Sequence, residues 1–449
     1  MGKYQAYAQY QESGEEWLGK VPYHWDVIQI KHLSVVKRGA SPRPIDDAKY
    51  FDENGEYAWT RIADVTASDV YLTRAPQRLS DLGSSLSVKL EPESLFLSIA
   101  GTVGKPCITG MKACIHDGFV YFPELKIPSK FLFYVFAGEQ AYKGLGKFGT
   151  QLNLNTDTVG GIKIGCTTND ELEGIINFLD HETAKIDTLI DKQQQLITLL
   201  KEKRQAVISH AVTKGLNPNA PMRDSGVEWL GEVPAHWELP KLIHRTSRIG
   251  DGLHSTPKYQ DNTGYYFVNG NNLVNGQISI GATAKEVPEE EYKSHYVHLD
   301  ESSVMLSING TIGNVARYNG EKIILGKSAA YMNCSDNLLP EYLLLYLQSS
   351  QALRYFDLEV TGTTIFNLSL NSIRQMRVCI PLKAEQVEIS EFCTFQRDKY
   401  DALIHKARSA IALMLERRTA LISAAVTGKI DIRNWVAPVT TNNNKEVAE

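Results

Sequence analysis

The sequence predicts an α/β (α+β) fold: two divergent copies of one domain, joined by two long antiparallel α-helices that form a coiled coil with approximate two-fold symmetry. The first observation is a repeat, because Ser13–Trp25 returns as Ser225–Trp237, an offset of 212 in a chain of 449 residues. Both segments read Ser-Gly-x-Glu-Trp-Leu-Gly-x-Val-Pro-x-His-Trp. The second observation is a long apolar periodicity of helical spacing that closes each copy. A repeat of this length indicates two copies of a whole domain rather than a solenoid.

Further repeated motifs extend over nearly the whole chain. Leu97–Gly104 and Leu306–Gly313 share Leu-Ser-Ile-x-Gly-Thr-x-Gly. Glu202–Thr213 and Glu416–Thr427 share Glu-(Lys/Arg)-Arg-x-Ala-(Val/Leu)-Ile-Ser-x-Ala-Val-Thr, and a Gly-Thr…Asn-Leu motif also occurs in both copies. The stretches between these motifs barely resemble each other. The two copies therefore share a frame and differ in what fills it.

The composition is that of an ordinary globular protein, with 43% hydrophobic and 22% charged residues. A chain of 449 residues suffices for two or three domains that each bury a core. No apolar run approaches the roughly 18 residues of a membrane span, and the N-terminus lacks the hydrophobic region of a signal peptide. We therefore expect a soluble, cytoplasmic protein without a membrane partner. The six cysteines form no CxxC pair, so buried free thiols are expected rather than disulfides or a metal site.

The charge distribution is more informative than the net charge. A net charge of −5 and a pI near 6.2 do not by themselves favour a nucleic-acid partner. Basic residues nevertheless cluster at the same point of the frame in each copy. A charge cluster is commonly a solvated surface, but its repetition favours a function. The first cluster comprises Lys31, Lys37, Arg38 and Arg43, and the second comprises Lys241, His244, Arg245 and Arg248.

Short strands and tight turns are predicted ahead of each helical stretch. Residues 57–62 and 265–268 alternate or run apolar between Gly, Asn and Pro residues, as strands do. The Leu-Ser-Ile-x-Gly-Thr-x-Gly motif follows an apolar strand in each copy, so its glycines are expected to make a tight turn. The alternative is a phosphate-binding loop. No helical pattern follows either motif directly, which favours the turn.

The long helices are predicted from apolar residues at three- and four-residue steps. The first pattern runs from Ile175 to Val212 without Gly or Pro until Gly215, and the second runs from Ile389 to Val426 before Gly428. A helix of that length is a rod of roughly 57 Å at ~1.5 Å per residue. One small domain cannot cover such a rod, so each helix is expected to pack on the other as a coiled coil.

Connectivity predicts the orientation of the two helices. The first helix leads into the second copy through Asn217–Pro221, so the two domains are attached at opposite ends of a rod and the second helix returns antiparallel, as in a dumbbell. The alternative is that each helix packs only on its own domain. The predicted boundaries are 1–168 for the first domain, 169–214 for the central helix, 215–382 for the second domain, 383–428 for the C-terminal helix and 429–449 for a flexible tail.

Two related domains held at a fixed distance suit a long linear target that is read at two places. DNA-binding dimers work in this way, because the geometry of the protein sets the spacing of the half-sites. Identical domains would read a palindrome. The divergent domains of this chain therefore predict an asymmetric, bipartite DNA site.

The chain resembles the specificity (S) subunits of type I restriction-modification systems over nearly its whole length. The residues that carry the resemblance are the Tyr7–Tyr10 lead-in and the repeated motifs given above. The resemblance implies two target recognition domains joined by two antiparallel helices, in a subunit that performs no chemistry. It also implies that the subunit binds double-stranded DNA, docks two methylation (M) subunits and, with restriction (R) subunits, forms a nuclease. No cofactor is expected on this chain, whereas S-adenosylmethionine, ATP and Mg²⁺ are expected in the partner subunits.

Candidate catalytic motifs in the sequence are weak. The chain has no Pro-Pro, and hence no Asn-Pro-Pro-Tyr or Asp-Pro-Pro-Tyr tetrapeptide for adenine methylation. Gly320–Ser328 has five residues where a P-loop needs four. Asp117 with Glu124 and Lys126 resembles a nuclease carboxylate set only faintly, and the second copy has no such acids. No catalytic residue and no metal site are therefore expected.

Candidate DNA-reading residues were sought among side chains that contact phosphate or base edges. Arg61 aligns with Asn269 and Asp64 with Asn272, swaps that fit different base preferences but equally fit surface divergence. The doubled His-Trp is expected to pack a helix against its domain rather than to touch DNA. The full set of candidates is Lys37, Arg38, Arg43, Arg61, Asp64, Thr150 and Gln151 in the first copy, and Arg248, His254, Lys258, Asn269, Asn272, Thr363 and Thr364 in the second.

The exposed faces of the long helices are candidate partner-binding surfaces. Lys201, Arg204, Arg417 and Arg418 could serve partner subunits or the DNA phosphates between the half-sites, and the sequence leaves both open. Two other function classes also remain open. One is a self-sufficient DNA-modifying enzyme, and the other is a coiled-coil scaffold that binds only proteins.

Overall fold

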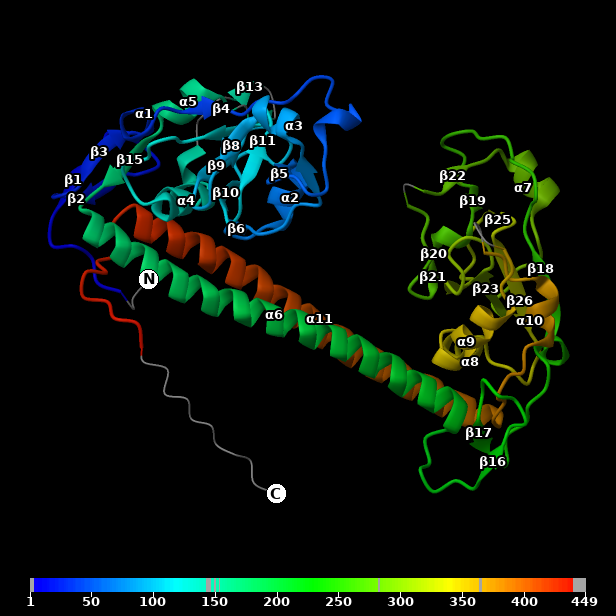
Figure 1. Cartoon of the computed structure of the whole chain (residues 1–449). Helices are drawn as coiled ribbons and strands as arrows, with labels where there is room; N and C mark the ends of the chain where they lie inside the picture. Colours follow the sequence, from blue (N-terminus) through cyan, green and yellow to red (C-terminus); the bar gives the residue numbers. More distant parts are fainter. Residues whose placement is uncertain are drawn as a thin grey trace. The chain divides into compact units, whose positions relative to one another are not determined.

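The computed structural model describes residues 4–142, 147–148, 151–152, 154–281, 283–362 and 366–438. It divides into two compact units (Figure 1). Unit 1 comprises residues 1–193 and 409–449, and unit 2 comprises residues 194–408. The division passes through both long helices, so each unit contains one α/β domain and half of each helix.

The two long helices are α6 (Asn169–Lys214) and α11 (Lys383–Val426). Each is followed by a glycine with positive φ, +76° at Gly215 and +66° at Gly428. Glycine adopts this left-handed conformation without steric cost and commonly ends a helix. The prediction of two long helices from the apolar periodicity is therefore confirmed.

Within each unit, the start of one helix packs beside the end of the other. Leu172–Leu179 and Ile422–Val426 contribute to the same core in unit 1, as Ile208–Val212 and Ile389 do in unit 2. Two ion pairs link the helices, Asp187 with Arg418 in unit 1 and Arg204 with Asp401 in unit 2. From the first pair to the second, α6 advances 17 residues and α11 goes back 17. The helices are therefore antiparallel and pack on each other as well as on the domains.

Unit 1 is a mixed α/β domain. Its sheets have the orders β4-β12-β9-β10-β6 and β7-β5-β11-β8, and β1-β2, β3-β15 and β13-β14 form smaller pairs. The strands are β1 (Tyr10–Glu12), β2 (Lys20–Pro22), β3 (Asp26–Gln29), β4 (Lys37–Arg38), β5 (Tyr57–Thr60), β6 (Tyr71–Leu72), β7 (Gln77–Leu79), β8 (Val88–Leu90), β9 (Leu95–Ser98), β10 (Pro106–Thr109), β11 (Ala113–Ile115), β12 (Phe119–Tyr121), β13 (Lys147–Phe148), β14 (Gln151–Leu152) and β15 (Lys163–Cys166). The shorter helices are α1 (Ile30–Leu33), η1 (Ala48–Tyr50), α2 (Ile62–Ala67), α3 (Asp81–Ser85), α4 (Ser129–Ala137), η2 (Gln140–Tyr142) and α5 (Thr156–Gly161).

Unit 2 has a similar arrangement, with fewer strands in each of its two larger sheets. Its sheets have the orders β18-β26-β23-β24 and β22-β19-β25, with β16-β17 and β20-β21 as smaller pairs. The strands are β16 (Met222–Asp224), β17 (Glu232–Pro234), β18 (Thr246–Asp251), β19 (Tyr266–Val268), β20 (Leu273–Val274), β21 (Gln277–Ile278), β22 (Lys285–Glu286), β23 (Ser303–Ser307), β24 (Val315–Arg317), β25 (Ile323–Leu325) and β26 (Ala329–Cys334). The shorter helices are η3 (Leu242–Arg245), η4 (Gly270–Asn272), α7 (Glu289–His295), α8 (Pro340–Leu347), α9 (Ser350–Glu359) and α10 (Leu370–Gln375).

The strand pairing shows that the two units are copies of one fold. The order β4-β12-β9-β10 in unit 1 corresponds to β18-β26-β23-β24 in unit 2. The parallel pair β5–β11 corresponds to the parallel pair β19–β25. The predicted fold class, two divergent α/β domains with two long helices, is confirmed.

The repeated glycine motif forms the expected tight turn. Gly101 and Gly104 have φ of +63° and +85°, and Gly310 and Gly313 have φ of +73° and +94°. In both units the second glycine donates its backbone N–H to the carbonyl oxygen of the serine that ends the strand, Ser98 or Ser307. A strand follows each turn, β10 or β24, rather than a helix. The phosphate-loop alternative is therefore wrong.

The segment after α11 corrects the predicted flexible tail. Ile430 and Ile432 are buried in the core of unit 1, and the Trp435 ring lies edge-on to Phe178 of α6, with centroids 5.4 Å apart. Asp431 donates its backbone N–H to the carbonyl oxygen of Gln5. Apolar side chains placed among polar ones let this segment pack although it has no regular structure. Residues 429–438 are therefore part of unit 1, whereas 439–449 lie outside the described residues.

Candidate nucleic-acid interface

The doubled His-Trp motif holds the start of a long helix in each unit. In unit 1 the Trp25 side chain is fully buried, and its Nε1 donates to Glu171 Oε1 of α6 at 3.2 Å. His24 Nε2 lies 2.9 Å from Glu171 Oε2. In unit 2 the buried Trp237 donates to Glu385 of α11 at 3.1 Å, and His236 Nε2 lies 3.0 Å from Glu385 Oε2. We call each Trp–His–Glu group a helix mount, and its contacts agree with the prediction that the Trp and His pack a helix against its domain.

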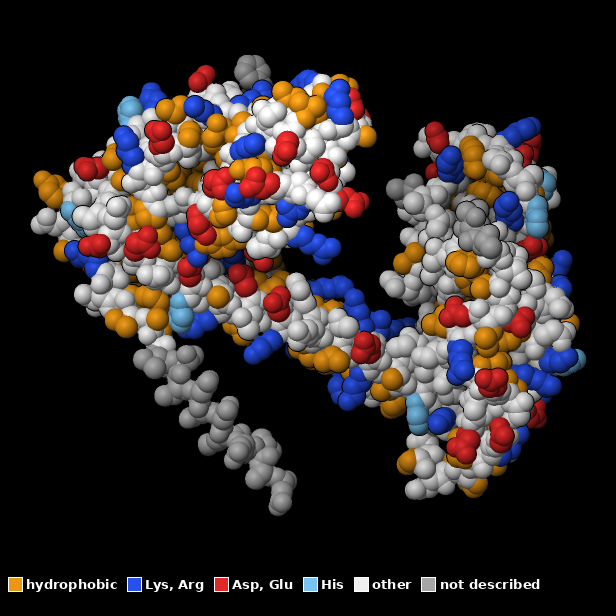
Figure 2. Space-filling view, viewed as in Figure 1, with side chains coloured by type: hydrophobic (Ala, Val, Ile, Leu, Met, Phe, Trp, Pro, Cys, Tyr) orange, Lys and Arg blue, Asp and Glu red, His pale blue; other side chains and the backbone are white. Residues whose placement is uncertain are grey.

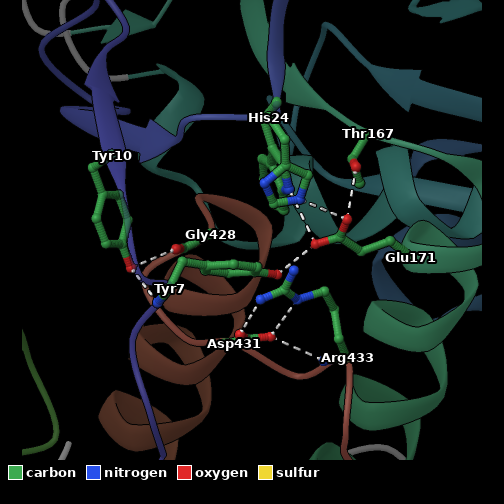
Figure 3. A network of polar contacts seen from close by, with 9 residues as sticks. Tyr7, Tyr10, His24, Thr167, Glu171, Gly428, Asp431 and Arg433 are labelled. Atoms are coloured by element: carbon green, nitrogen blue, oxygen red, sulfur yellow. Dashed lines mark hydrogen bonds and ion pairs between the residues drawn. The ribbon is translucent and has the colours of Figure 1, made fainter.

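The helix mount of unit 1 has additional partners (Figure 3). Tyr7 donates its hydroxyl to Glu171 Oε1 at 2.6 Å, and Thr167 donates to Glu171 Oε2 at 2.7 Å. Burial raises the pKa of Glu171, but the hydrogen bonds from Tyr7, Thr167, His24 and Trp25 outweigh burial, and the net pKa lies below its usual value of 4.5. The ionised carboxylate is therefore the favoured form.

The C-terminal segment closes over the same group of residues. The guanidinium of Arg433 lies 4.9 Å from the centre of the Tyr7 ring, within cation–π distance. Its Nη2 is 2.6 Å from Asp431 Oδ2, and Tyr10 donates its hydroxyl to the carbonyl oxygen of Gly428 at 3.1 Å. We call residues 429–435 the clasp. The clasp ties the end of α11 to the N-terminal segment of unit 1.

A cavity of about 680 Å³ opens in the variable part of unit 1. The parallel strands β5 and β11 pair as Trp59 with Cys114 and Thr60 with Ile115, so the residues that follow them meet at one edge of the sheet. The carboxyl ends of parallel strands are a common place for ligands. The lining residues are Ser41, Pro42, Arg43, Pro44, Ile45, Asp46, Trp59, Arg61, His116 and Asp117.

Asp117 organises the polar side of this cavity. Its Oδ2 is 3.2 Å from Arg43 Nη2, and Ser41 donates its hydroxyl to Oδ1 at 3.3 Å. Arg38 of β4 donates from Nε to the Asp117 carbonyl oxygen at 2.5 Å. The side chains of Arg43 and Asp117 are 80% and 43% exposed, respectively. The cavity therefore presents both a cation and a carboxylate to a ligand.

His116 lies beside these groups as a neutral ring. Burial lowers its pKa, and the nearby Asp117 only partly offsets that effect. Gly118 donates its backbone N–H to His116 Nδ1 at 2.8 Å. Because Nδ1 is an acceptor, the neutral ring carries its proton on Nε2.

The equivalent edge of unit 2 has different chemistry. Strands β19 and β25 pair as Val268 with Leu325, and Asn269, Gly326, Lys327 and Ser328 follow them. The segment before each edge is held in the same register, because Ala40 donates its N–H to the Ile115 carbonyl and Leu253 to the Leu325 carbonyl. In this register Arg43 corresponds to Thr256, Arg61 to Asn269 and Asp117 to Lys327.

The same register corrects the expectation that the two basic clusters occupy one point of the frame. Tyr121 pairs with Lys37 in unit 1, and the equivalent Tyr331 pairs with Gly250 in unit 2. Arg38 therefore corresponds to Asp251, and Arg248 has no basic counterpart. The prediction matched the two clusters by their charge, whereas backbone hydrogen bonds set the register of the strands.

Two of the predicted base-reading residues have a role in local structure. Asp64 Oδ2 accepts the Arg61 backbone N–H at 2.8 Å and caps α2. Asn272 Oδ1 accepts the Asn269 N–H at 2.9 Å in the same way, and its side chain is 1% exposed. The alignment of Asp64 with Asn272 therefore reflects a repeated capping position. Asn272 is too buried to contact DNA, which corrects that prediction, whereas Asp64 is partly exposed and stays a prediction.

The structure brings only some of the other candidates together. Arg43 and Arg61 line the cavity of unit 1, Arg38 contacts the backbone of the lining residue Asp117, and Lys37 is exposed on β4. Asn269 accepts a hydrogen bond from the Ser328 hydroxyl at 3.1 Å, and His254 pairs with Asp251 at 2.8 Å. Of the rest, Arg248 and Lys258 are exposed, Thr150, Thr363 and Thr364 lie outside the described residues, and the side chain of Gln151 is likewise not described.

The helix candidates divide into two groups. Arg204 and Arg418 form the ion pairs between α6 and α11, so these side chains serve the helix pair. Lys201 and Arg417 are exposed. All four residues stay predictions for partner binding, although Arg204 and Arg418 already form ion pairs.

The described residues contain little else that indicates catalysis. Among them, no group of three or more His, Cys, Asp or Glu side chains is arranged to hold a metal ion. No helix in the described ranges is long and apolar enough to cross a membrane. All six cysteines are buried free thiols, as expected. On the face seen in Figure 2, acidic and basic side chains are interspersed over the domain of unit 1 rather than gathered in a field of one sign.

Sequence reasoning missed several functional residues. Glu171 and Glu385 were not singled out, although both follow the same offset of 214 and lie at helix starts. Asp117 was considered only as a nuclease carboxylate, and Lys327 and His116 were not considered. The available signal was a charged residue two positions after an apolar strand in each copy.

The comparisons with known proteins agree with this architecture. Residues 250–410 match the family model described as type I restriction modification DNA specificity domain. This segment of the chain therefore resembles a type I DNA specificity domain. The resemblance to type I specificity subunits, predicted from the repeated motifs, is thereby confirmed.

A curated relative and one solved structure extend the likeness to almost the whole chain. The type I restriction enzyme MjaIX specificity subunit of Methanocaldococcus jannaschii is 22% identical over 94% of this chain and 97% of its own length. A chain solved in work on complex assembly and conformational transition of the type I R-M system has a TM-score of 0.65 at 13% identity, covering 91% of this chain and 99% of that one. The HsdS subunit of Thermoanaerobacter tengcongensis has a TM-score of 0.47 at 12% identity, covering 91% and 98%. Over 91% of its length, the chain therefore has the fold of the first of these solved chains.

Proposed function

We propose that the chain is a non-catalytic DNA-recognition subunit that reads a bipartite, asymmetric DNA site, with one half-site for each unit. One observation carries the proposal. The two units have the same helix mount and the same parallel strand pair, yet at the edge of that pair unit 1 presents Arg43, Arg61 and Asp117 where unit 2 presents Thr256, Asn269 and Lys327. A fixed frame with different polar side chains suits two readers of different sequences.

The proposal assigns the chemistry to partner subunits. The specificity subunits that the chain resembles act within type I restriction enzymes. Two methylation subunits and the restriction subunits would supply the chemistry that uses S-adenosylmethionine, ATP and Mg²⁺. This chain would determine the DNA sequence at which they act. Because such a complex acts on chromosomal DNA, the proposal includes a cytoplasmic location. The exposed Lys201 and Arg417 are the helix residues we assign to partner or phosphate contacts.

The long helices set the distance between the half-sites in this proposal. Insertion of one heptad into both helices together keeps the two helices in register, so we expect a longer spacer between unchanged half-sites. Methylation by the complex would report the new spacer. An active complex with the original spacer would contradict this role of the helices.

The direct test of the function is the methylation pattern of a host that carries this chain and its methylation subunit. We expect modified adenines in a motif of two different half-sites separated by a fixed number of unspecified bases. Deletion of the gene should remove that motif alone. A continuous motif, or none, would contradict the proposal.

The enzyme and scaffold alternatives have their own tests. Purified chain incubated with DNA and S-adenosylmethionine should transfer no methyl group, and with Mg²⁺ and ATP it should cut no strand. Activity of the isolated chain would favour the enzyme. Specific DNA binding by the complex would exclude a scaffold that binds only proteins.

A further inference from the structure

Two carboxylates, Asp46 and Asp117, line the cavity, and phosphate binding explains neither; Asp117 is the one that pairs with Arg43. DNA presents a negatively charged backbone, which a carboxylate repels. Arg43 and Arg61 alone would make a phosphate site, yet Arg43 shares the cavity with Asp117, at 3.2 Å from its Oδ2. A carboxylate on a DNA-reading surface can therefore contact DNA favourably only where the DNA offers it a hydrogen-bond donor.

Such donors are found on base edges. In the major groove the donors are the exocyclic amines of cytosine and adenine. Arginine reads the O6 and N7 acceptors of guanine, and aspartate accepts from cytosine N4. An arginine and a carboxylate side by side therefore match the two halves of one G·C pair.

The geometry of Asp117 suits this role. Ser41 and Arg43 hold its two oxygens, and Arg38 holds its backbone carbonyl oxygen. The side chain still has 43% of its surface exposed, so a base edge can reach it. Fixed side chains with an accessible face discriminate better than mobile ones, because binding then costs little ordering.

Unit 2 reverses the charges at the same two positions. Arg38 corresponds to Asp251 and Asp117 to the exposed Lys327. A lysine ammonium has three donors and no acceptor, so it cannot accept from cytosine. The exchange of an acceptor for a donor at one register position is what two different half-sites require.

We propose that Asp117, positioned by Ser41 and Arg43, is a specificity-determining residue that selects a G·C pair in the half-site of unit 1. It accepts a hydrogen bond from cytosine N4, and Lys327 excludes that contact in unit 2. The inference rests on the proposed function and deepens it.

The test uses the full chain with its methylation subunit and compares the methylation motif of Asp117→Asn and Asp117→Lys with that of the wild type. We expect one G·C position of one half-site to lose discrimination by roughly tenfold to a hundredfold. The other half-site and the spacer should not change. Lys327→Asp should alter only the half-site that Asp117 does not. Asp69→Lys is the matched control, because Asp69 is an exposed carboxylate of unit 1 outside the cavity and its loss should leave the motif intact.

The outcomes separate the inference from the function it rests on. A wild-type chain with a bipartite motif, and an active Asp117→Asn chain with the same motif, would overturn the inference and leave the proposed function standing. A change in the spacer or in both half-sites would overturn it too. If Asp117→Lys fails to assemble, Asp117→Asn decides, because it keeps the size of the side chain and one acceptor oxygen for Arg43. A wild-type chain without a bipartite motif would overturn the proposed function itself.

Discussion

Units 1 and 2 hold a long helix with the same three side chains but surround them differently. Both have a buried tryptophan and a histidine on a glutamate at the helix start. In unit 1 the Tyr7 hydroxyl is a further donor to that glutamate, and the clasp covers it. By the repeat offset the position of Tyr7 is taken in unit 2 by Asn219, which is exposed. In unit 2 the end of α6 continues through the chain into the first residues of the domain. In unit 1 the end of α11 is joined to the first residues of the domain only by the noncovalent contacts of the clasp.

The candidate DNA-reading edges of the two units differ in another way from the helix mounts. The helix mounts have the same three residues in both units and differ in the residues that contact them. The edges of β5–β11 and β19–β25 have the same backbone register and differ in their side chains. Backbone pairing positions a residue whatever its type, so charge can be exchanged there at little cost to the fold. This difference separates the residues that should govern stability from those that should govern specificity.

The largest stability effect is expected from the tryptophans. Trp25→Ala and Trp237→Ala each remove a buried ring from a core, which costs about 3–5 kcal/mol. Each variant should lower hydrogen-exchange protection in its own unit. Equal loss in both units from either variant would show that the helix mounts are not independent.

Removal of the clasp should affect unit 1 alone. Deletion of 429–449 exposes the sites of Ile430 and Ile432, which are now buried. Burial of each contributes about 1.5–3 kcal/mol, offset in part by the entropy of ordering the segment, so we expect a net loss of about 2–4 kcal/mol. Deletion of 439–449 is the control and should be neutral. Hydrogen exchange at residues 4–10 is the readout, and unchanged protection there would contradict the role of the clasp.

The glutamates should differ between the units. Glu171→Gln disturbs four donors and Glu385→Gln two, so we expect a loss of about 1–3 kcal/mol in unit 1 and less in unit 2. Since the folded pKa of Glu171 is lowered, its stabilisation is present above the ordinary value of 4.5 and is lost as pH falls through the folded value. Acid unfolding of unit 1 below pH 4.5 should therefore become less steep in Glu171→Gln. An unchanged acid transition would contradict the claim that ionised Glu171 stabilises unit 1.

The smallest effect is expected from the ion pairs between the helices. Arg204 and Arg418 are partly exposed, with 34% and 27% of their side chains accessible, so each pair should contribute about 0.2–1 kcal/mol. A double-mutant cycle with Asp401 or Asp187 measures each coupling. A coupling above this range would mean that the helix pair depends on charge more than on apolar packing.

Local patterns in the sequence were sufficient for the frame. Apolar steps of three and four predicted α6 and α11, and the glycines of the repeated turn adopt the positive φ expected of them. What failed depends on contacts between distant residues. Trp25 and Glu171 are 146 positions apart, and Arg43 and Asp117 are 74. No local spacing predicts such pairs, nor the docking of Trp435 on Phe178. The prediction for Asn272 was wrong because a helix cap and a base contact use the same side chains.

The central claim is that a common frame carries two exchangeable readers. The most direct measurement is the methylation motif of a chimera in which residues 39–121 are replaced by their equivalents 252–331, so that both units carry the reader of unit 2. The account predicts that the complex modifies an inverted repeat of one half-site, because two identical domains read a palindrome. An assembled, active complex that keeps the original asymmetric motif would contradict it.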